Sequence, residues 1–165
     1  MTGSEQLADP VRALCLDLGR RRIGVAVSDR SGTVASARTV LERSGSREQD
    51  HRRIAALVRE EEAEIVVVGL PLSMNGGHGA AAKGALSEAR AIGSVVGVPV
   101  VTHDERLSTV TAERTLREAG LDGRKRRAVV DKVAAAVILQ SWLDTRRSDA
   151  RRSGSGASDA EGPRP

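Results

Sequence analysis

The sequence predicts an α/β protein built on a five-stranded mixed sheet with helices on both faces. Two apolar stretches, at residues 13–18 and 23–27, are separated by a short turn, as expected for hairpin-linked strands. From residue 46 onward, stretches with helical periodicity alternate with short apolar runs. The predicted order is β-β-β-α-β-α-β-α-α. Strands connected through helices are parallel, so the later strands should extend the first hairpins into a mixed sheet.

The first three predicted strands form consecutive hairpins. Residues 13–18, ALCLDL, are apolar on both faces and predict a central strand. Residues 23–27 predict a second strand, separated from the first by a short turn. The sequence DRSG then provides a hairpin turn into a third strand over residues 32–41.

The next two predicted elements are a helix and a buried strand. Over residues 46–62, Ile54, Leu57 and Val58 recur at i, i+3 and i+4, and charged residues fill the other positions. This spacing predicts an amphipathic helix with its charges in solvent. The following run EIVVVGL, residues 64–70, is short and apolar, which is typical of a strand buried on both faces.

A glycine-rich loop at residues 71–79 separates this strand from a predicted helix over residues 80–97. The loop glycines suit either backbone contacts to phosphate or a flexible turn. The run VPVVTH at residues 98–103 predicts the fifth strand. A helix over residues 108–119 follows, with Ser108 as N-cap and Gly120 after its end.

A long last helix over residues 124–145 completes the predicted domain, which spans residues 11–145. Residues 1–10 are predicted to be a flexible leader. Residues 146–165, which are polar and rich in Gly, Ser and Pro, are predicted to be a disordered basic tail.

Composition limits the classes of function. A net charge of +4 permits a polyanionic partner. With no Phe, no Tyr and one Trp, the chain cannot stack bases extensively, so a nucleic acid would be held by its backbone and shape. One cysteine excludes an internal disulfide, and Cys15 is expected to be buried. No apolar run is long enough for a membrane span or a signal peptide. A cytoplasmic location follows as an expectation.

Carboxylates from distant parts of the chain are the candidate catalytic groups. Asp17 ends the first strand, and Asp104 and Glu105 follow the fifth, so they should meet at one sheet edge. Asp131 shares a helix face with apolar residues at +4, +7 and +11, namely Ala135, Ile138 and Trp142. An acid on such a face needs a cation or a hydrogen-bond network. One of the arginines 20, 21, 22 or 106 could provide that cation.

A shared divalent ion is the alternative explanation for these acids. Clustered carboxylates repel one another, and hard ions with oxygen ligands neutralise them. Mg²⁺ held by carboxylates and phosphate oxygens is the arrangement found in phosphoryl-transfer sites. Neighbours on an extended chain point to opposite sides, so only one of Asp104 and Glu105 is expected to be a direct ligand.

Four segments resemble, in order, those of the YqgF-type pre-16S rRNA nuclease family, also described as Holliday-junction-resolvase-like proteins. The segments are LDLGRRRIGVAVSD, VVGLPLSMNGG, THDERLST and DKVAAAVILQSWL. The resemblance covers about residues 12–144. It implies a ribonuclease H-like fold and a metal-dependent nuclease that matures the 5′ end of precursor 16S rRNA during ribosome biogenesis. Asp17, Glu105 and Asp131 match the family's acidic positions, and the resemblance favours Glu105 over Asp104.

The resulting hypothesis is that Asp17, Glu105 and Asp131 are catalytic and bind one or two Mg²⁺ or Mn²⁺ ions. Basic residues beside these acids are candidates for binding the nucleic-acid backbone, and a solvated helix start is the less favoured alternative for those at residues 124–127. They are Arg20, Arg21, Arg22, Arg106, Arg124, Lys125, Arg126 and Arg127.

Three further hypotheses remain open at this stage. The substrate could be a branched DNA junction, and a resolvase of that kind would act as a homodimer to make paired cuts. The chain could instead be a nucleic-acid-binding ribosome-assembly factor with little activity. An actin-like kinase is disfavoured, because those enzymes need two such domains and only roughly 135 residues are expected to fold here.

Overall fold

The computed structural model describes residues 11–71, 79–105 and 123–155, and within the last range it describes the side chains of residues 133–154. Five strands form one sheet in the order β3-β2-β1-β4-β5. Pairs β1–β2 and β2–β3 are antiparallel, and pairs β1–β4 and β4–β5 are parallel, which confirms the predicted mixed sheet. The strands are Ala13–Leu18, Arg22–Ser28, Ala35–Glu42, Ile65–Leu70 and Val100–Asp104.

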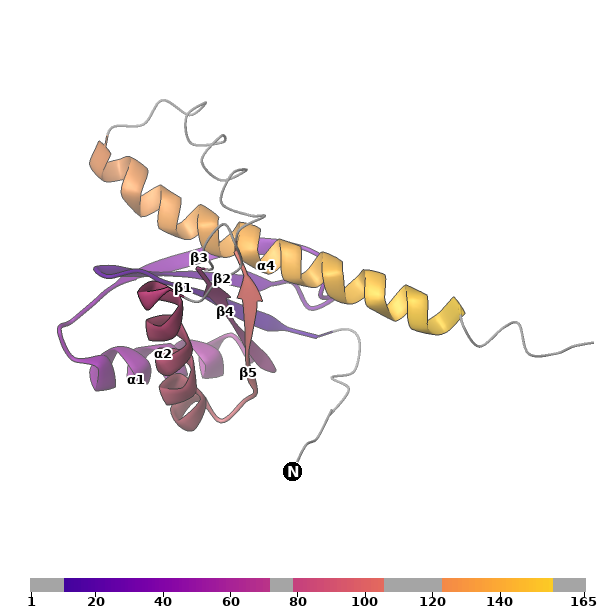
Figure 1. Ribbon diagram of the computed structural model, residues 1–165, viewed down its shortest axis with the longest axis horizontal. Helices are drawn as coiled ribbons and strands as arrows, with labels where there is room; N and C mark the ends of the chain where they lie inside the picture. The colour runs from indigo at the N-terminus through magenta and orange to yellow at the C-terminus, as the bar shows by residue number, and fades with distance from the viewer. Residues whose placement is uncertain (1–10, 72–78, 106–122, 156–165) are drawn as a thin grey trace, which may run out of the picture.

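Helices cover both faces of the sheet (Figure 1). Helices α1, Arg47–Glu60, and α2, Ala80–Val96, pack side by side on one face. Helix α4, Gly123–Ser155, crosses the other face over β1, β2 and β3. The predicted helix over residues 108–119 and most of the predicted loop over residues 71–79 lie outside the described residues.

Strand alternation divides the core into two layers. In β1, Leu14 and Leu16 pack with the layer under α1 and α2, whereas Ala13 and Cys15 pack with the layer under α4. All four residues are fully buried, as predicted for a central strand. The same alternation assigns Asp17 to the α4 face and Leu18 to the opposite face.

The turn between β2 and β3 makes the third strand start later than predicted. The carboxylate of Asp29 accepts hydrogen bonds from the backbone N–H groups of Thr33 and Val34, at 2.8 and 3.1 Å. Gly32 has a φ of +65°, which L side chains rarely adopt. These bonds keep residues 29–34 in a compact turn, so β3 begins at Ala35 and not at residue 32.

Helix α4 extends further than the composition of the tail predicted. Disorder was expected from Arg146, but the helix continues to Ser155. Side-chain hydroxyls of Thr145, Ser148 and Ser153 each donate to the carbonyl four residues earlier, at 2.9 to 3.1 Å. Once its packed part has nucleated, a helix adds residues at low cost, and arginine is a good helix former. Residues 156–165 lie outside the described residues.

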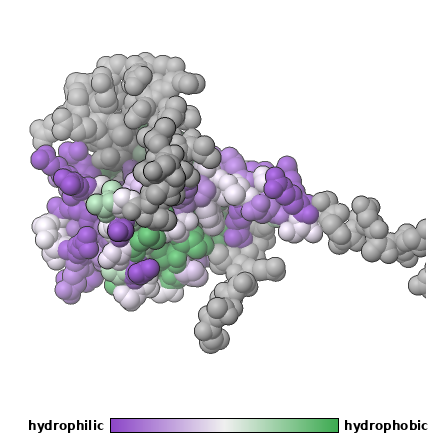
Figure 2. All heavy atoms as spheres, viewed as in Figure 1, coloured by the Kyte–Doolittle hydropathy of each residue, from purple (hydrophilic) through white to green (hydrophobic). Residues whose placement is uncertain are grey.

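On the face of the molecule seen in Figure 2, charged regions surround an apolar area. Figure 2 shows hydrophobic residues gathered around the edge strand β5. Leu86, Val98, Pro99 and Val100 line a shallow groove there, between β5 and α2. Within the described ranges, no helix is long and apolar enough to cross a membrane.

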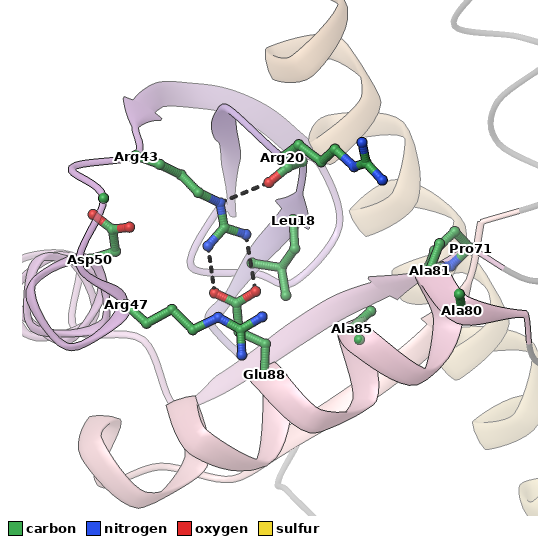
Figure 3. A pocket seen from close by; sticks show the side chains of 13 residues that line it. Leu18, Arg20, Arg43, Arg47, Asp50, Pro71, Ala80, Ala81, Ala85 and Glu88 are labelled. Carbon is green, nitrogen blue, oxygen red and sulfur yellow. Dashed lines mark hydrogen bonds and ion pairs between the residues drawn. The ribbon is translucent and has the colours of Figure 1, made fainter.

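A buried polar network joins the β3–α1 connection to α2. The guanidinium of Arg43 donates two hydrogen bonds to the Glu88 carboxylate, at 2.8 and 3.0 Å, and a third to the Gly19 carbonyl (Figure 3). The His51 ring nitrogen Nε2 lies 3.0 Å from the same carboxylate. Glu88 and His51 are both buried. The periodicity of α1 had assigned its charged residues to solvent, so the sequence did not predict this network.

We expect Glu88→Ala to lower the free energy of unfolding by about 3 kcal/mol, because it leaves the Arg43 charge buried without its partner. Urea unfolding measures this change. The control Glu48→Ala removes an exposed pair with Arg52 and should cost about 0.5 kcal/mol or less. Equal losses in the two variants would contradict a structural role for the network.

The same carboxylate makes stability depend on pH. Burial alone would raise the pKa of Glu88, but hydrogen bonds from Arg43 and His51 lower this pKa below its ordinary value of 4.5. The ionised form is therefore favoured by folding, and its contribution is present above pH 4.5 and lost as the pH falls through the lowered pKa. The stability of Glu88→Gln should accordingly vary less with pH in this acidic window.

Candidate active site

Asp17 lies at the carboxyl end of the central strand. It pairs with Gly24 of β2, and the parallel register of β1 with β4 continues from the pair Leu16–Val68 to place Asp17 level with Gly69. The side chain of Asp17 belongs to the face covered by α4. A carboxylate at this position is half-buried.

Glu105 directly follows β5, and its backbone N–H donates to the Leu70 carbonyl at 3.3 Å. Burial raises the pKa of Glu105 to about 7, with further contributions from the charges of Asp17 and Asp104. The strand order brings these acids from residues 17 and 104–105 to one edge of the sheet. The predicted meeting of Asp17 and Glu105 is therefore present.

Gly69 makes room for the Glu105 carboxylate. A Cβ atom built on Gly69 would lie 2.8 Å from Glu105 Oε2 and 2.8 Å from Ile138 Cδ1. Any larger residue would have to displace the Glu105 carboxylate and the end of the Ile138 side chain. This role of Gly69 was not predicted from the sequence, although a glycine inside the apolar run IVVVGL is itself a signal of a close approach.

Two other titratable side chains lie near the acids on the α4 side. Burial, together with the charges of Asp17 and Glu105, raises the pKa of the Cys15 thiol well above its ordinary value, so Cys15 stays protonated. This agrees with the expected buried cysteine. The His103 ring nitrogen Nε2 lies 3.0 Å from Ser141 Oγ of α4. Burial lowers the pKa of His103, which favours a neutral ring that joins β5 to α4.

Helix α4 runs from the acidic edge of the sheet toward the opposite edge. Ile138 lies beside Gly69 and Glu105, whereas the Gln140 amide bonds to Ala35 and Thr33, level with the start of β1. Asp131 precedes the buried residue Ala135 by about one turn of α4. Its backbone therefore lies between the start of the helix and Ile138, toward the edge of the sheet that carries the acids. The side chain of Asp131 lies outside the described residues.

The carboxylates of Asp17 and Glu105 are suitable ligands for a hard divalent cation. Both donate only oxygen ligands, and a cation between them would relieve the repulsion that raises the pKa of Glu105. Among the described side chains, no three His, Cys, Asp or Glu residues lie together in a way that could hold a metal ion. The side chain of the expected third ligand, Asp131, is not among them.

The structure describes the side chains of only some of the basic residues that were predicted to bind nucleic acid. Arg20 and Arg21 are exposed in the turn that follows Asp17. Arg22 is half-buried and pairs with Glu42 at 3.6 Å. The structure therefore brings one basic group beside the acids. The side chains of Arg106, Arg124, Lys125, Arg126 and Arg127 lie outside the described residues.

Acids at the carboxyl edge of a β3-β2-β1-β4-β5 sheet, with helices on both faces, define a ribonuclease H-like protein. Thermus thermophilus RuvC, solved in complex with a Holliday junction substrate, has this fold, with a TM-score of 0.54 over 84% of this chain and 96% of that chain at 19% identity. The model of the RuvX family, described as Holliday junction resolvase, matches residues 11–145, and this chain belongs to that family.

Curated relatives match over nearly the same residues. A protein of Anaeromyxobacter sp. (strain Fw109-5) is 49% identical over 84% of this chain and 100% of its own length. A Listeria innocua protein is 46% identical over 82% of this chain and 99% of its own length. Both are named "Putative pre-16S rRNA nuclease". The family resemblance and the ribonuclease H-like fold expected from the sequence are confirmed.

Proposed function

We propose that this protein is a divalent-metal-dependent nuclease that hydrolyses phosphodiester bonds at the edge where Asp17 and Glu105 meet. The observation that carries the proposal is the placement of Glu105, which is held over Gly69 with its pKa raised to about 7 by burial and by the neighbouring acids. The ionised form of such a carboxylate destabilises the metal-free fold, but it is well positioned to bind a cation. Membership of the RuvX family supports the nuclease assignment.

Asp17, Glu105 and Asp131 are the proposed ligands of Mg²⁺ or Mn²⁺. Bound divalent ions in such sites activate water and stabilise the leaving oxygen of a phosphodiester. Asp17 provides an oxygen ligand from the rigid central strand, and Gly69 leaves the space that Glu105 needs. Asp131 would complete the set from α4. Alternation along β5 assigns Asp104 to the opposite face from His103, which favours Glu105 as the direct ligand.

The proposed substrate is precursor 16S rRNA, trimmed at its 5′ end. The names of the curated relatives support this substrate, and it would place the protein in the cytoplasm, where ribosomes are assembled. The second candidate is a branched DNA junction, which the description of the family model favours. A resolvase makes paired cuts, so that activity would require a homodimer.

Cleavage-site mapping on precursor 16S rRNA and on a four-way DNA junction, side by side, tests the proposal. We expect cuts at the 5′ end of the 16S sequence with Mg²⁺ or Mn²⁺ and no cuts after chelation with EDTA. Symmetric cuts on the junction alone would favour the second candidate. Absence of cleavage on both substrates with either ion would favour an assembly factor with little catalytic activity.

The exposed arginines after Asp17 are the proposed contacts to the nucleic-acid backbone. We expect the double variant Arg20→Ala/Arg21→Ala to weaken RNA binding and to reduce the slope of log affinity against log salt by about two. Fluorescence anisotropy over a range of salt concentrations measures this slope. The control Arg30→Ala, an exposed arginine paired with Glu62, should leave the slope unchanged. An unchanged slope in the double variant would argue against phosphate contacts there.

A further inference from the structure

We propose that a cavity between the starts of α1 and α2 binds a phosphate-bearing nucleotide of the nucleic-acid strand, beside the cleavage site. This α1–α2 cavity has a volume of about 550 Å³, which is within the range of small-molecule sites. Figure 3 shows the side chains that line it. The inference rests on the proposed nuclease function and adds a second contact region for its substrate.

The α1–α2 cavity begins at the same sheet edge as the acids, on the other face. Leu18, which lines it, directly follows Asp17, and Pro71, which also lines it, directly follows β4. Asp17 belongs to the α4 face and Leu18 to the face of α1 and α2. A nucleic-acid strand bound at Asp17 and Glu105 would therefore reach the cavity by passing over this edge of the sheet.

Small residues of α2 form one wall of the cavity. Ala80, Ala81, Gly84 and Ala85 contribute to it. Glycine inside a helix is destabilising relative to alanine, and a Cβ atom built on Gly84 would meet nothing within 4 Å. Packing within the described residues therefore does not require a glycine at this position. The missing side chain instead enlarges the cavity.

The charge balance of the lining favours an anion. The carboxylate of Glu88 is compensated by Arg43, and that of Asp50 accepts from the Ser44 N–H and lies 3.7 Å from Arg53. Arg20 and Arg47 remain as the two exposed cations of the lining. Neither makes a hydrogen bond or an ion pair within 4 Å among the described residues, and the charge of Arg47 is also one of the causes that lower the pKa of Glu88. The lining therefore has positive charge available for a phosphate.

The position of Arg47 is not explained by the stability of its helix. Arg47 is the first residue of α1, where the helix dipole disfavours a cation. Its side chain extends over the cavity toward Glu88 (Figure 3). Across the cavity, the N-cap of α2 is Gly79, which provides no side-chain cap, so the first N–H groups of α2 add positive character at Ala80 and Ala81. Both features suit a phosphate.

Binding of the metal-free full-length protein to a short fluorescent single-stranded RNA tests this site without requiring cleavage. Arg47→Ala removes the proposed phosphate contact, and Gly84→Leu fills the cavity. The matched controls are Arg52→Ala on the same helix, which lies outside the cavity, and Gly93→Leu on α2, where a Cβ makes only ordinary contacts with Val100. Circular dichroism and thermal unfolding confirm that each variant is folded.

We expect Arg47→Ala and Gly84→Leu each to weaken RNA binding about tenfold, whereas the controls stay within about twofold of wild type. The salt slope of Arg47→Ala should fall by about one. If wild type binds RNA and both variants bind as their controls do, the cavity proposal is wrong and the nuclease proposal stands. If wild type binds no RNA, the cavity proposal fails, and the nuclease proposal is decided separately by cleavage of precursor 16S rRNA and of the DNA junction.

Competition with adenosine monophosphate shows whether the cavity binds a nucleotide within an RNA strand or a free nucleotide. We expect it to compete with RNA for wild type only weakly, at millimolar concentration. If Gly84→Leu lost binding of adenosine monophosphate but kept full RNA affinity, the cavity would be a site for a free nucleotide and the proposal for the strand would be overturned.

Discussion

Asp17→Asn is expected to reduce phosphodiester cleavage about a thousandfold or more, which corresponds to about 4 kcal/mol of lost transition-state stabilisation. Asn keeps the size of Asp but removes the negative charge that a divalent ion requires. Because Asp17 lies on the central strand and lines the acidic edge, the loss should appear in kcat with both Mg²⁺ and Mn²⁺. Cleavage assays at saturating metal measure it. Full activity of this variant would contradict the proposed site.

The same substitution should stabilise the metal-free fold. Burial and the charges of Asp17 and Asp104 raise the pKa of Glu105 to about 7, above its ordinary value of 4.5. The ionised form of Glu105 is thus disfavoured by folding, and stability is lost as the pH rises from 4.5 toward 7. Removing the Asp17 charge relieves part of this repulsion. We expect a higher Tm for Asp17→Asn in EDTA at pH 8, whereas the exposed control Asp149→Asn should match wild type.

Gly69→Ala is expected to reduce cleavage about a hundredfold, because misplacement of a catalytic group by about 1 Å has effects of that size. The added Cβ atom would lie 2.8 Å from Glu105 Oε2 and from Ile138 Cδ1, so the carboxylate of Glu105 and the end of the Ile138 side chain must both shift. Overpacking of this kind also costs about 1–3 kcal/mol of stability. Activity is therefore compared at a temperature where both proteins are fully folded.

A double-mutant cycle separates positioning from a general loss of stability. If Gly69 acts through Glu105, Gly69→Ala should have little further effect on cleavage in the background of Glu105→Gln. The control Gly93→Ala adds a Cβ at an ordinary distance of 3.7 Å from Val100 and should remain fully active. Additive losses in the cycle would show that Gly69 does not act by positioning Glu105.

The layers of the fold could be predicted because burial is encoded in local patterns. Apolar runs such as IVVVGL identify strands covered on both faces, and the helical spacing of Ile54 and Val58 identifies the packed face of α1. The order of elements then restricts the topology, since strands joined by helices are parallel. The meeting of Asp17 and Glu105 followed from this topology and not from any local signal.

Other features depend on contacts between distant residues. The spacing of Ala85, Glu88 and Ile92 assigns Glu88 to the buried face of α2, but its partner Arg43 lies 45 residues away in the sequence, so no local pattern indicates the pair. The contact between Gly69 and Glu105 likewise appears only when β4 and β5 lie together. The length of α4 was underestimated because composition alone does not show that a packed helix can propagate into a polar segment.

Divalent-ion binding by Asp131→Asn shows whether acids from β1, from the end of β5 and from α4 share one metal site. Mn²⁺ titration calorimetry on the full-length protein, with cleavage measured on the same samples, compares this variant with wild type and with Asp149→Asn. If the three acids share one site, Mn²⁺ binding weakens about tenfold or more and cleavage is lost in Asp131→Asn alone. Wild-type affinity and wild-type cleavage in Asp131→Asn would contradict it.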